Sequence, residues 1–308
     1  MTLVWLPPDA PDDLAPLPGS LRLHRSANLP AEAAKVEVVV AAPGNLSAFR
    51  AGLPRLTGLR FVQTPSAGVD FLPALPEHVV LANASGVHDG PVSEWVLGVI
   101  LAMEKRLPHY LSEQQAQRWD VGGNAAFAGG RAAGDLAEQT VLIVGMGSIG
   151  RAVAQRLAPF GTEVLGVARR ARDGVAGVEA LPQLLERADI VVLLAPATPQ
   201  TQGIVDAGFL ERMRPGALLV NAARGSLVDT GALLTALHDG RIRVALDVTD
   251  PEPLPDGHPL WSAPGCLITP HVAGSTDHWK GRAYRLIADQ LRRYAAGEPL
   301  LNVRTSGY

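Results

Sequence analysis

The stretch "VLIVGMGSIGRAVAQRLAPFGTEVLGVARRARDG", residues 141–174, decides the fold of this chain. An apolar run leads directly into Gly145 and a helical pattern follows, so Gly145, Gly147 and Gly150 stand at a strand–turn–helix junction. The first glycine allows a tight turn, the second lets the backbone meet a pyrophosphate, and the third lets helix and strand approach. The N-terminus of the helix offers unpaired N–H groups and partial positive charge to the phosphates.

This context favours a dinucleotide-binding turn over a glycine-rich turn without a ligand. Cofactor contacts are therefore predicted along the whole turn, at Gly145, Met146, Gly147, Ser148, Ile149 and Gly150.

The end of the second strand of this motif indicates which dinucleotide is bound. NAD-binding versions carry Asp or Glu there, which bonds the ribose 2′-OH and repels a 2′-phosphate. In this chain the place holds Ala168, followed by Arg169 and Arg170. A guanidinium can pair with a phosphate or lie flat against adenine. The pattern predicts NADP (NADPH) as the preferred cofactor, with NAD as the second choice; the alternative is that these arginines and Arg172 form a solvated surface turn.

The composition is that of a globular protein with more than one domain. The chain has 308 residues, of which 47% are hydrophobic and 19% charged, a length that suits two domains. A formal net charge of -3 gives no basic face for nucleic acid, and no run of eighteen apolar residues predicts a membrane span. Cys266 is the single cysteine, expected to be a small buried residue, and a cytoplasmic location is predicted.

The pattern along the chain predicts two α/β domains. Short apolar runs in the first hundred residues predict strands at 3–6, 21–24, 36–42, 59–64 and 79–83, followed by a helix over 89–106. From Thr140 a regular βαβ rhythm predicts strands at 141–145, 163–168, 190–194, 217–221, 243–248 and 266–269, a parallel sheet covered on both faces. A last helix is expected within 275–297, capped by Thr276 or Asp277 and stopped by Gly297.

We therefore predict a doubly wound Rossmann domain over 101–274 and a smaller flavodoxin-like α/β domain over 1–100, completed by 275–308. No internal repeat or low-complexity tract stands out.

Three later segments place a polar residue just beyond an apolar strand. They read "LLVNAARGSLVD" (218–229), "VALDVTDPEPLPDGHPLW" (244–261) and "LITPHVAGST" (267–276). Ligands of an open parallel sheet bind outside the carboxyl ends of the strands, so we expect Arg224, Glu252 and His271 to converge near the nicotinamide.

These motifs, with "TPSAGVD" (64–70) and "GVHDGPVSEW" (86–95), resemble in the same order those of the D-isomer-specific 2-hydroxyacid dehydrogenases, over nearly the whole length. The resemblance implies that Arg224, Glu252 and His271 match the Arg-Glu-His triad of that family. The chemistry fits these roles: His271 would deliver the proton to the carbonyl oxygen, Glu252 would fix its tautomer and favour imidazolium, and Arg224 would hold the substrate carboxylate or carbonyl.

The resemblance implies further contacts. Backbone N–H groups of Ala67, Gly68 and Val69 would bind the substrate carboxylate, with a plain tight turn as the alternative. Asp247 would lie near the nicotinamide amide, and other cofactor-lining positions would be Ala195, Ala222, Ala223 and the stretch from His271 to Gly274. The family commonly dimerises through the nucleotide domain, so residues 109–127 are a candidate arm of a homodimer, or else a surface helix and loop.

Some residues compete with this interpretation or depart from the family pattern. His258, six residues after Glu252, is a rival acid, and no His, Asp and Glu grouping has the spacing of a metal site. Thr249 stands where the family commonly has an aromatic residue, and His88 where it often has Asn. Glu252 argues against the formate dehydrogenase branch, in which an amide replaces this carboxylate.

The predicted function is reduction of a small 2-oxo acid, of the glyoxylate or hydroxypyruvate kind, to the D-2-hydroxy acid with NAD(P)H. The alternatives are a phosphoglycerate-type dehydrogenase of the same family, or a catalytically weak, NAD(P)-sensing protein of the corepressor kind. No nucleic acid or membrane partner is expected.

Overall fold

The computed structural model describes residues 1–12, 14, 16–120, 134–172 and 174–304, and the chain divides into two compact units. Unit 1 comprises residues 1–88 and 276–308, and unit 2 comprises residues 89–275. Residues 89–100, which the sequence places in the first domain, belong to unit 2. The reason is that helix α2 (Asp89–Glu104) packs against helix α4 (Ser148–Leu157) and against strands of the second sheet.

Unit 1 contains a six-stranded sheet in the order β13-β5-β4-β3-β1-β2. Its strands are β1 (Thr2–Leu6), β2 (Leu21–Arg25), β3 (Val36–Val40), β4 (Phe61–Gln63), β5 (Val80–Ala82) and β13 (Val303–Arg304). All neighbours pair in parallel except β13, which is antiparallel to β5. The parallel part has the order 2-1-3-4-5, which is that of flavodoxin, so the predicted fold of the smaller domain is confirmed.

Helices cover both faces of this sheet. On one face α1 (Leu46–Gly52) brings Phe49 against Trp5, with their ring centroids 6.4 Å apart. On the other face α8 (Trp279–Ala296) brings Ile287 and Leu291 against the strands, and it ends at Gly297, which has a φ of 69°. The predicted end of this helix at Gly297 is confirmed.

The predicted cap of α8 is wrong. The residue before the helix is His278, and its side chain makes no capping bond. The hydroxyl of Thr276 instead accepts a hydrogen bond of 3.2 Å from Arg282.

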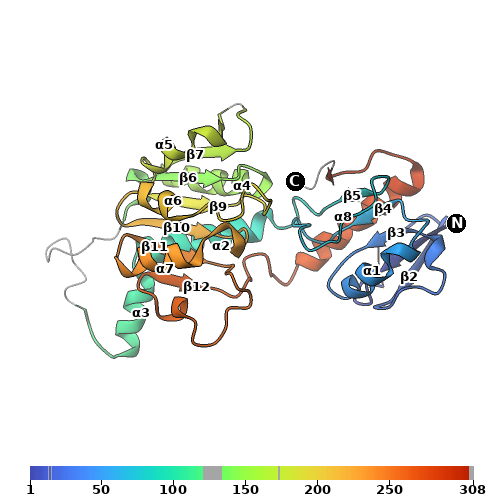
Figure 1. The fold of residues 1–308 in the computed structure, drawn as a ribbon, viewed down its shortest axis with the longest axis horizontal. Helices are drawn as coiled ribbons and strands as arrows, with labels where there is room; N and C mark the ends of the chain where they lie inside the picture. Colours follow the sequence, from blue (N-terminus) through green and yellow to red (C-terminus); the bar gives the residue numbers. More distant parts are fainter. Residues whose placement is uncertain (13, 15, 121–133, 173, 305–308) are drawn as a thin grey trace. The chain divides into compact units, whose positions relative to one another are not determined.

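Unit 2 contains a seven-stranded sheet in the order β12-β11-β10-β9-β6-β7-β8, with every neighbouring pair parallel. Its strands are β6 (Thr140–Val144), β7 (Glu163–Ala168), β8 (Ala176–Gly177), β9 (Ile190–Leu193), β10 (Ala217–Asn221), β11 (Ile242–Leu246) and β12 (Cys266–Ile268). Counted from β6, the order of the first six strands is 3-2-1-4-5-6, the doubly wound Rossmann order. Figure 1 shows this sheet with its covering helices.

Alternate side chains of the unit 2 strands supply two cores, because successive residues of a strand point to opposite faces. Val141 and Ile143 of β6 pack with α2 and α4, whereas Leu142 and Val144 pack on the other face. That second face is covered by α5 (Leu181–Leu185), α6 (Ala207–Arg212) and α7 (Thr230–His238). Both faces of the sheet are therefore buried, and its strand ends carry the polar residues.

The end of α2 is fixed by a buried ion pair. Glu104 is 2% exposed, and its carboxylate accepts a hydrogen bond of 2.6 Å from Arg243 at the start of β11 and one of 2.7 Å from Gln139. Removing one member of such a pair leaves a buried charge without its partner, a loss of about 3–5 kcal/mol. This pair therefore fixes α2 at the amino edge of the sheet.

The remaining described elements are short. They are α3 (Leu107–Gln115) and the 3-10 turns Ala33–Lys35, Leu53–Arg55, Leu136–Glu138, Ala158–Phe160, Val178–Ala180, Gly225–Leu227 and Pro259–Ser262. Helix α3 lies in the candidate dimer arm, of which residues 121–127 fall outside the described residues. Within the described part of the chain, no helix is long and apolar enough to cross a membrane.

Candidate active site

The glycine turn has the geometry that its sequence predicts. Gly145 has a φ of +110°, and a Cβ there would lie 2.4 Å from the backbone of Leu194 and Ala195. A Cβ at Gly150 would lie 2.6 Å from the carbonyl oxygen of Gly145, whereas a Cβ at Gly147 would meet nothing within 4 Å. The first and third glycines are thus required by the protein itself, and the open space at the second suits the close approach of a ligand.

The N-terminus of α4 adjoins this open space. Gly147 precedes the helix, whose N-terminus has no side-chain cap, and a helix N-terminus of this kind favours an anion. A pyrophosphate therefore fits the turn.

The loop after β7 is tied to the glycine turn. Ala168 is the last residue of β7 and pairs with Gly177 of β8. Arg169 and Arg170 follow it and are exposed, whereas the guanidinium of Arg172 donates a hydrogen bond to the carbonyl of Met146. Arg172 is exposed as well, and this bond joins it to the glycine turn. This bond holds the arginine-bearing loop beside the pyrophosphate turn.

The three predicted catalytic residues follow three adjacent strands of the same parallel sheet. Arg224 comes three residues after β10, Glu252 lies in the loop after β11, and His271 follows β12. The glycine turn follows β6 in the same sheet, and Ala195 follows β9. Because all these strands are parallel, all these residues lie at one edge of unit 2.

Glu252 and His271 form a direct pair. The distance from His271 Nδ1 to Glu252 Oε1 is 2.5 Å, and the two side chains are 49% and 38% exposed. Nε2 of His271 makes no hydrogen bond to any residue that the structure describes. The backbone of His271 has a φ of 55°, a left-handed conformation that is uncommon for a residue with a side chain and that is found often at functional sites.

Asp247 holds the loop that carries His271. This residue is 3% exposed, and its Oδ1 accepts hydrogen bonds from the Thr269 hydroxyl at 2.6 Å and from the N–H of Val272 at 2.9 Å. Its Oδ2 accepts one from the N–H of Ala273 at 2.9 Å, and its carbonyl accepts one from the N–H of His271 at 2.7 Å. These hydrogen bonds to an ionised group are strong, so they fix the conformation of the loop that follows β12.

Arg224 is held from two directions. The buried amide of Asn221 donates a hydrogen bond of 2.8 Å to the Arg224 carbonyl and accepts one of 3.0 Å from the N–H of Ala223. At the next residue, a Cβ on Gly225 would lie 1.9 Å from the carbonyl oxygen of Thr249. The backbone of Gly225 therefore packs directly on the backbone of Thr249. The Arg224 loop is therefore fixed against the loop that leads to Glu252. The sequence analysis missed Asn221 and Gly225, although a polar residue that ends an apolar strand is a signal to look for.

The predicted carboxylate-binding loop lies in unit 1, after β4. Carbonyls of this loop accept hydrogen bonds from within unit 1. The Ser66 carbonyl accepts one of 2.9 Å from the N–H of Ala84 and one of 2.8 Å from the Thr64 hydroxyl. The Ala67 carbonyl accepts one from the side-chain amide of Asn83. Within the described residues, the N–H groups of Ala67 and Gly68 make no hydrogen bond. Val69 is buried. A loop with its carbonyls bonded and N–H groups available is suited to bind an anion.

The remaining predicted cofactor positions lie at the same edge of unit 2. Ala222 and Ala223 directly follow β10, and Gly274 lies in the loop after β12. Ala195 and Ala223 are buried. No contact with a cofactor is defined for these positions or for Asp247, so their part in binding stays a prediction.

The rival residues have other roles. The ring of His258 accepts a hydrogen bond of 3.2 Å from the N–H of Leu260, as a helix cap. The ring of His88 packs on Trp279 at 5.7 Å within unit 1. Burial raises the pKa of the Cys266 thiol to about 12, so this group stays protonated at neutral pH.

Metal-binding residues do not gather in the described part of the chain, which has no group of three or more His, Cys, Asp and Glu side chains that could hold a metal ion.

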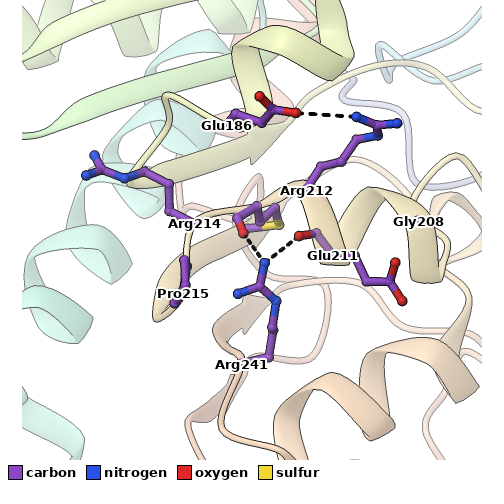
Figure 2. A pocket seen from close by; sticks show the side chains of 8 residues that line it. Glu186, Gly208, Glu211, Arg212, Arg214, Pro215 and Arg241 are labelled. Carbon is purple, nitrogen blue, oxygen red and sulfur yellow. Dashed lines mark hydrogen bonds and ion pairs between the residues drawn. The ribbon is translucent and has the colours of Figure 1, made fainter.

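A surface hollow of about 510 Å³ lies at the opposite edge of the unit 2 sheet. Figure 2 shows that its arginines are already bonded: Arg212 to Glu186 at 3.3 Å, and Arg241 to two backbone carbonyls, one of them that of Met213 at 2.6 Å. Arg214 bonds Asp189 at 2.8 Å. Because the hollow adjoins the amino ends of β10 and β11, it lies away from His271 and the glycine turn, and the bonds of its arginines to the protein itself indicate a structural role.

A doubly wound sheet of this strand order, with this glycine turn at the carboxyl end of its first strand, defines a dinucleotide-binding domain. The family model described as "D-isomer specific 2-hydroxyacid dehydrogenase, NAD binding domain" matches residues 97–273. The chain therefore belongs to the D-isomer-specific 2-hydroxyacid dehydrogenase family, and it is an NAD(P)-dependent enzyme of that family.

Relatives of known activity agree with this family. The chain is 32% identical over 253 residues to the human glyoxylate reductase/hydroxypyruvate reductase, a match that covers 79% of this chain and 76% of the relative. It is 35% identical over 268 residues to D-3-phosphoglycerate dehydrogenase of Mycobacterium tuberculosis, covering 85% of this chain but only 47% of that protein. The chain thus spans about half the length of that dehydrogenase.

Among solved structures, the NADPH-dependent glyoxylate/hydroxypyruvate reductase of Sinorhizobium meliloti, in complex with NADP and sulfate, superimposes with a TM-score of 0.82. The two chains are 27% identical, and the match covers 100% of each.

The open space at Gly147 generates a prediction about dinucleotide binding. Because no protein atom would meet a new side chain there, Gly147→Val should lower Tm by no more than about 4 °C. The valine methyl groups would occupy the space of the pyrophosphate, so the Kd for NADPH should rise at least about tenfold, as measured by calorimetry. Gly98→Val, on the exposed side of α2 and equally open, is the control and should leave the Kd unchanged. Wild-type affinity in Gly147→Val would contradict the assignment of this turn.

Proposed function

We propose that this protein reduces a small 2-oxo acid of the glyoxylate or hydroxypyruvate kind to the D-2-hydroxy acid, with NADPH as the preferred reductant. The observation that carries the proposal is the pair of His271 and Glu252, joined at 2.5 Å at the sheet edge that also bears the glycine turn. The glyoxylate and hydroxypyruvate reductases among the relatives support this substrate class.

His271 is the proton donor in this proposal. Its Nδ1 side is held by the Glu252 carboxylate, which fixes the orientation of the ring. Nε2 of His271 then carries the proton that passes to the carbonyl oxygen of the substrate. The half-exposed ring leaves that nitrogen accessible to a small ligand.

Arg224 binds and polarises the substrate. A guanidinium can hold a carboxylate through two parallel hydrogen bonds and can stabilise negative charge that grows on the carbonyl oxygen. Its loop is fixed by Asn221 and by the packing of Gly225, so the guanidinium starts from a defined backbone position. The N–H groups of Ala67 and Gly68 are the proposed second set of carboxylate donors.

The residues that would hold the cofactor are those of the glycine turn and of the loop after β7. The turn and the start of α4 would bind the pyrophosphate, and Arg169 and Arg170 would bind a 2′-phosphate. When bound, the reduced dinucleotide supplies a hydride to C2 of the substrate. In place of the usual acid, Ala168 itself adds no negative charge that would repel a 2′-phosphate.

The D-3-phosphoglycerate dehydrogenases among the relatives favour one second candidate, oxidation of a phosphorylated hydroxy acid. An assay across glyoxylate, hydroxypyruvate, pyruvate and phenylpyruvate with NADPH, and of 3-phosphoglycerate with NAD(P), separates the two. Turnover of 3-phosphoglycerate alone would replace the first candidate. Tight binding of NADPH without turnover of any of these acids would favour a sensor.

The role of His271 predicts a specific kinetic defect. His271→Ala should lower kcat for the best oxo acid by about 10²–10⁴-fold, because the proton donor is lost, while the Kd for NADPH stays unchanged. His258→Ala is the control and should keep kcat within about threefold, because that ring caps a turn. Near-wild-type kcat in His271→Ala would rule out the assignment.

The loop after β7 predicts the cofactor preference. The ratio of kcat/KM for NADPH to that for NADH should exceed one, and Arg169→Asp should lower the ratio at least about tenfold through charge repulsion. Arg187→Asp, at an exposed arginine paired with Glu163, is the control and should not change the ratio.

A clear wild-type preference for NADH would contradict the proposed cofactor. The carboxylate of Glu179 lies against Gly177, the residue paired with Ala168. In that case, a higher ratio of kcat/KM for NADPH to that for NADH in Glu179→Gln would identify this carboxylate as the group that binds the ribose 2′-OH.

The proposed assembly is a homodimer formed through the candidate arm at residues 109–127. Among its described residues, Leu111 is 55% exposed and Trp119 is 91% exposed. A wild-type dimer at micromolar concentration in analytical ultracentrifugation should become a monomer in Leu111→Glu/Trp119→Glu. Val178→Glu, at an apolar residue of unit 2 that is 45% exposed, should remain a dimer. A monomeric wild-type chain would refute the assembly.

A further inference from the structure

Asn221 is a fully buried amide at the end of an apolar strand. The four residues of β10 before it are alanine, leucine, leucine and valine, all buried, and Asn221 itself has no exposed surface. Its backbone carbonyl accepts a hydrogen bond of 2.9 Å from the N–H of Asp247, which ties the end of β10 to that of β11. A buried polar side chain in such a place is costly unless its groups are bonded, so its bonds show what it does.

Both ends of the Asn221 side chain bond the backbone of the turn that follows. Its Oδ1 accepts from the N–H of Ala223 at 3.0 Å, and its Nδ2 donates to the carbonyl of Arg224 at 2.8 Å. An amide is the one small side chain that presents an acceptor and a donor side by side. Aspartate would set a second acceptor against the Arg224 carbonyl, and alanine would leave both backbone groups unbonded by this side chain.

The far side of the same turn has little freedom. Gly225 packs on the backbone of Thr249, and the Thr230 hydroxyl donates a hydrogen bond of 2.9 Å to the carbonyl of Asp250. The turn is therefore held at two points, the Asn221 amide on one side and the Thr249–Asp250 backbone on the other. Arg224 lies in the short segment between them, and its guanidinium donates a hydrogen bond of 2.7 Å to the carbonyl of Ala223.

We infer that Asn221 is a positioning residue, which sets the location of Arg224 for the substrate without touching the substrate itself. This inference rests on the proposed role of Arg224. A shift of about 1 Å in a residue that orients substrate can cost about a hundredfold in rate, so the clamp affects catalysis and not stability alone.

Unit 1 supplies a matched control. Asn45 is 1% exposed, and its Oδ1 accepts a hydrogen bond of 3.0 Å from the N–H of Ala42 while its Nδ2 donates one of 3.1 Å to the carbonyl of Val40. Asn45 thus makes the same kind of two-sided backbone clamp beyond β3 in unit 1, whereas Arg224, Glu252 and His271 belong to unit 2. Asn45→Asp and Asn45→Ala should lower Tm as Asn221→Asp and Asn221→Ala do, but leave the kinetic constants unchanged.

The first test is a double-mutant cycle on the full-length enzyme, assayed well below Tm. Asn221→Asp and Asn221→Ala should lower kcat/KM for the best oxo acid about tenfold to a hundredfold, while the Kd for NADPH stays unchanged. In an Arg224→Lys background the same substitutions should cost less than about threefold, because the group that they position is already altered. Equal losses in both backgrounds would overturn the inference, as would an unchanged kcat/KM in both Asn221 variants.

The second test does not depend on activity. Amide hydrogen exchange of the peptide 222–228 should be at least about tenfold faster in Asn221→Ala than in the wild type or in Asn45→Ala, because the N–H of Ala223 loses its partner. Unchanged exchange there would overturn the clamp. If the wild-type enzyme turns over no oxo acid, the proposed function fails, and the exchange result alone decides whether Asn221 fixes this turn.

Discussion

The buried carboxylate of Asp247 is the interaction on which the candidate catalytic edge depends. Three loop groups donate to it, and its own carbonyl binds the N–H of His271. A carboxylate can replace its lost hydration only if such donors are close, so the loop has to fold around it. This folding carries His271 in a left-handed conformation toward Glu252. The pair that is proposed to deliver the proton is therefore built from a buried group that lies behind it.

The same arrangement occurs one strand away. Asn221 ends β10 as Asp247 follows β11, and each side chain turns back to hold the loop beyond the strand. Side chains that act on ligands are exposed and have many rotamers, whereas buried side chains with complete hydrogen bonding have few. In this protein the loops that carry Arg224 and His271 are thus supported by buried polar groups. The hydrophobic cores on both faces of the sheet hold the strands that carry those groups.

The sequence predicted those features that follow from local chemistry. The conformations of Gly145 and Gly150 follow from the absence of a side chain, and the positions of Glu252 and His271 follow from the rule that parallel strands end at one edge. The bond from Arg172 to Met146 was not predictable, because the direction of a long side chain depends on tertiary contacts.

The role of Asn221 was not predictable either, because the sequence does not show whether a polar side chain at a strand end faces solvent or bonds its own backbone. The two-residue strands β8 and β13 were missed because they are too short to show a period. These two strands form only because each pairs with the edge strand of an existing sheet, β7 for β8 and β5 for β13.

Unit 1 is completed by residues that come last in the chain, and this order affects synthesis. Ile287 and Leu291 of α8 cover one face of the unit 1 sheet, and β13 adds its edge strand. The strands of residues 1–88 leave the ribosome nearly two hundred residues earlier than that helix. Until α8 and β13 have been synthesised, this face keeps an apolar surface open, whereas the residues of unit 2 are already present and can fold. The nascent chain thus presents a target for chaperones for most of its synthesis, and a premature stop after residue 275 would release a protein whose nucleotide-binding half is intact but whose other half lacks part of its core.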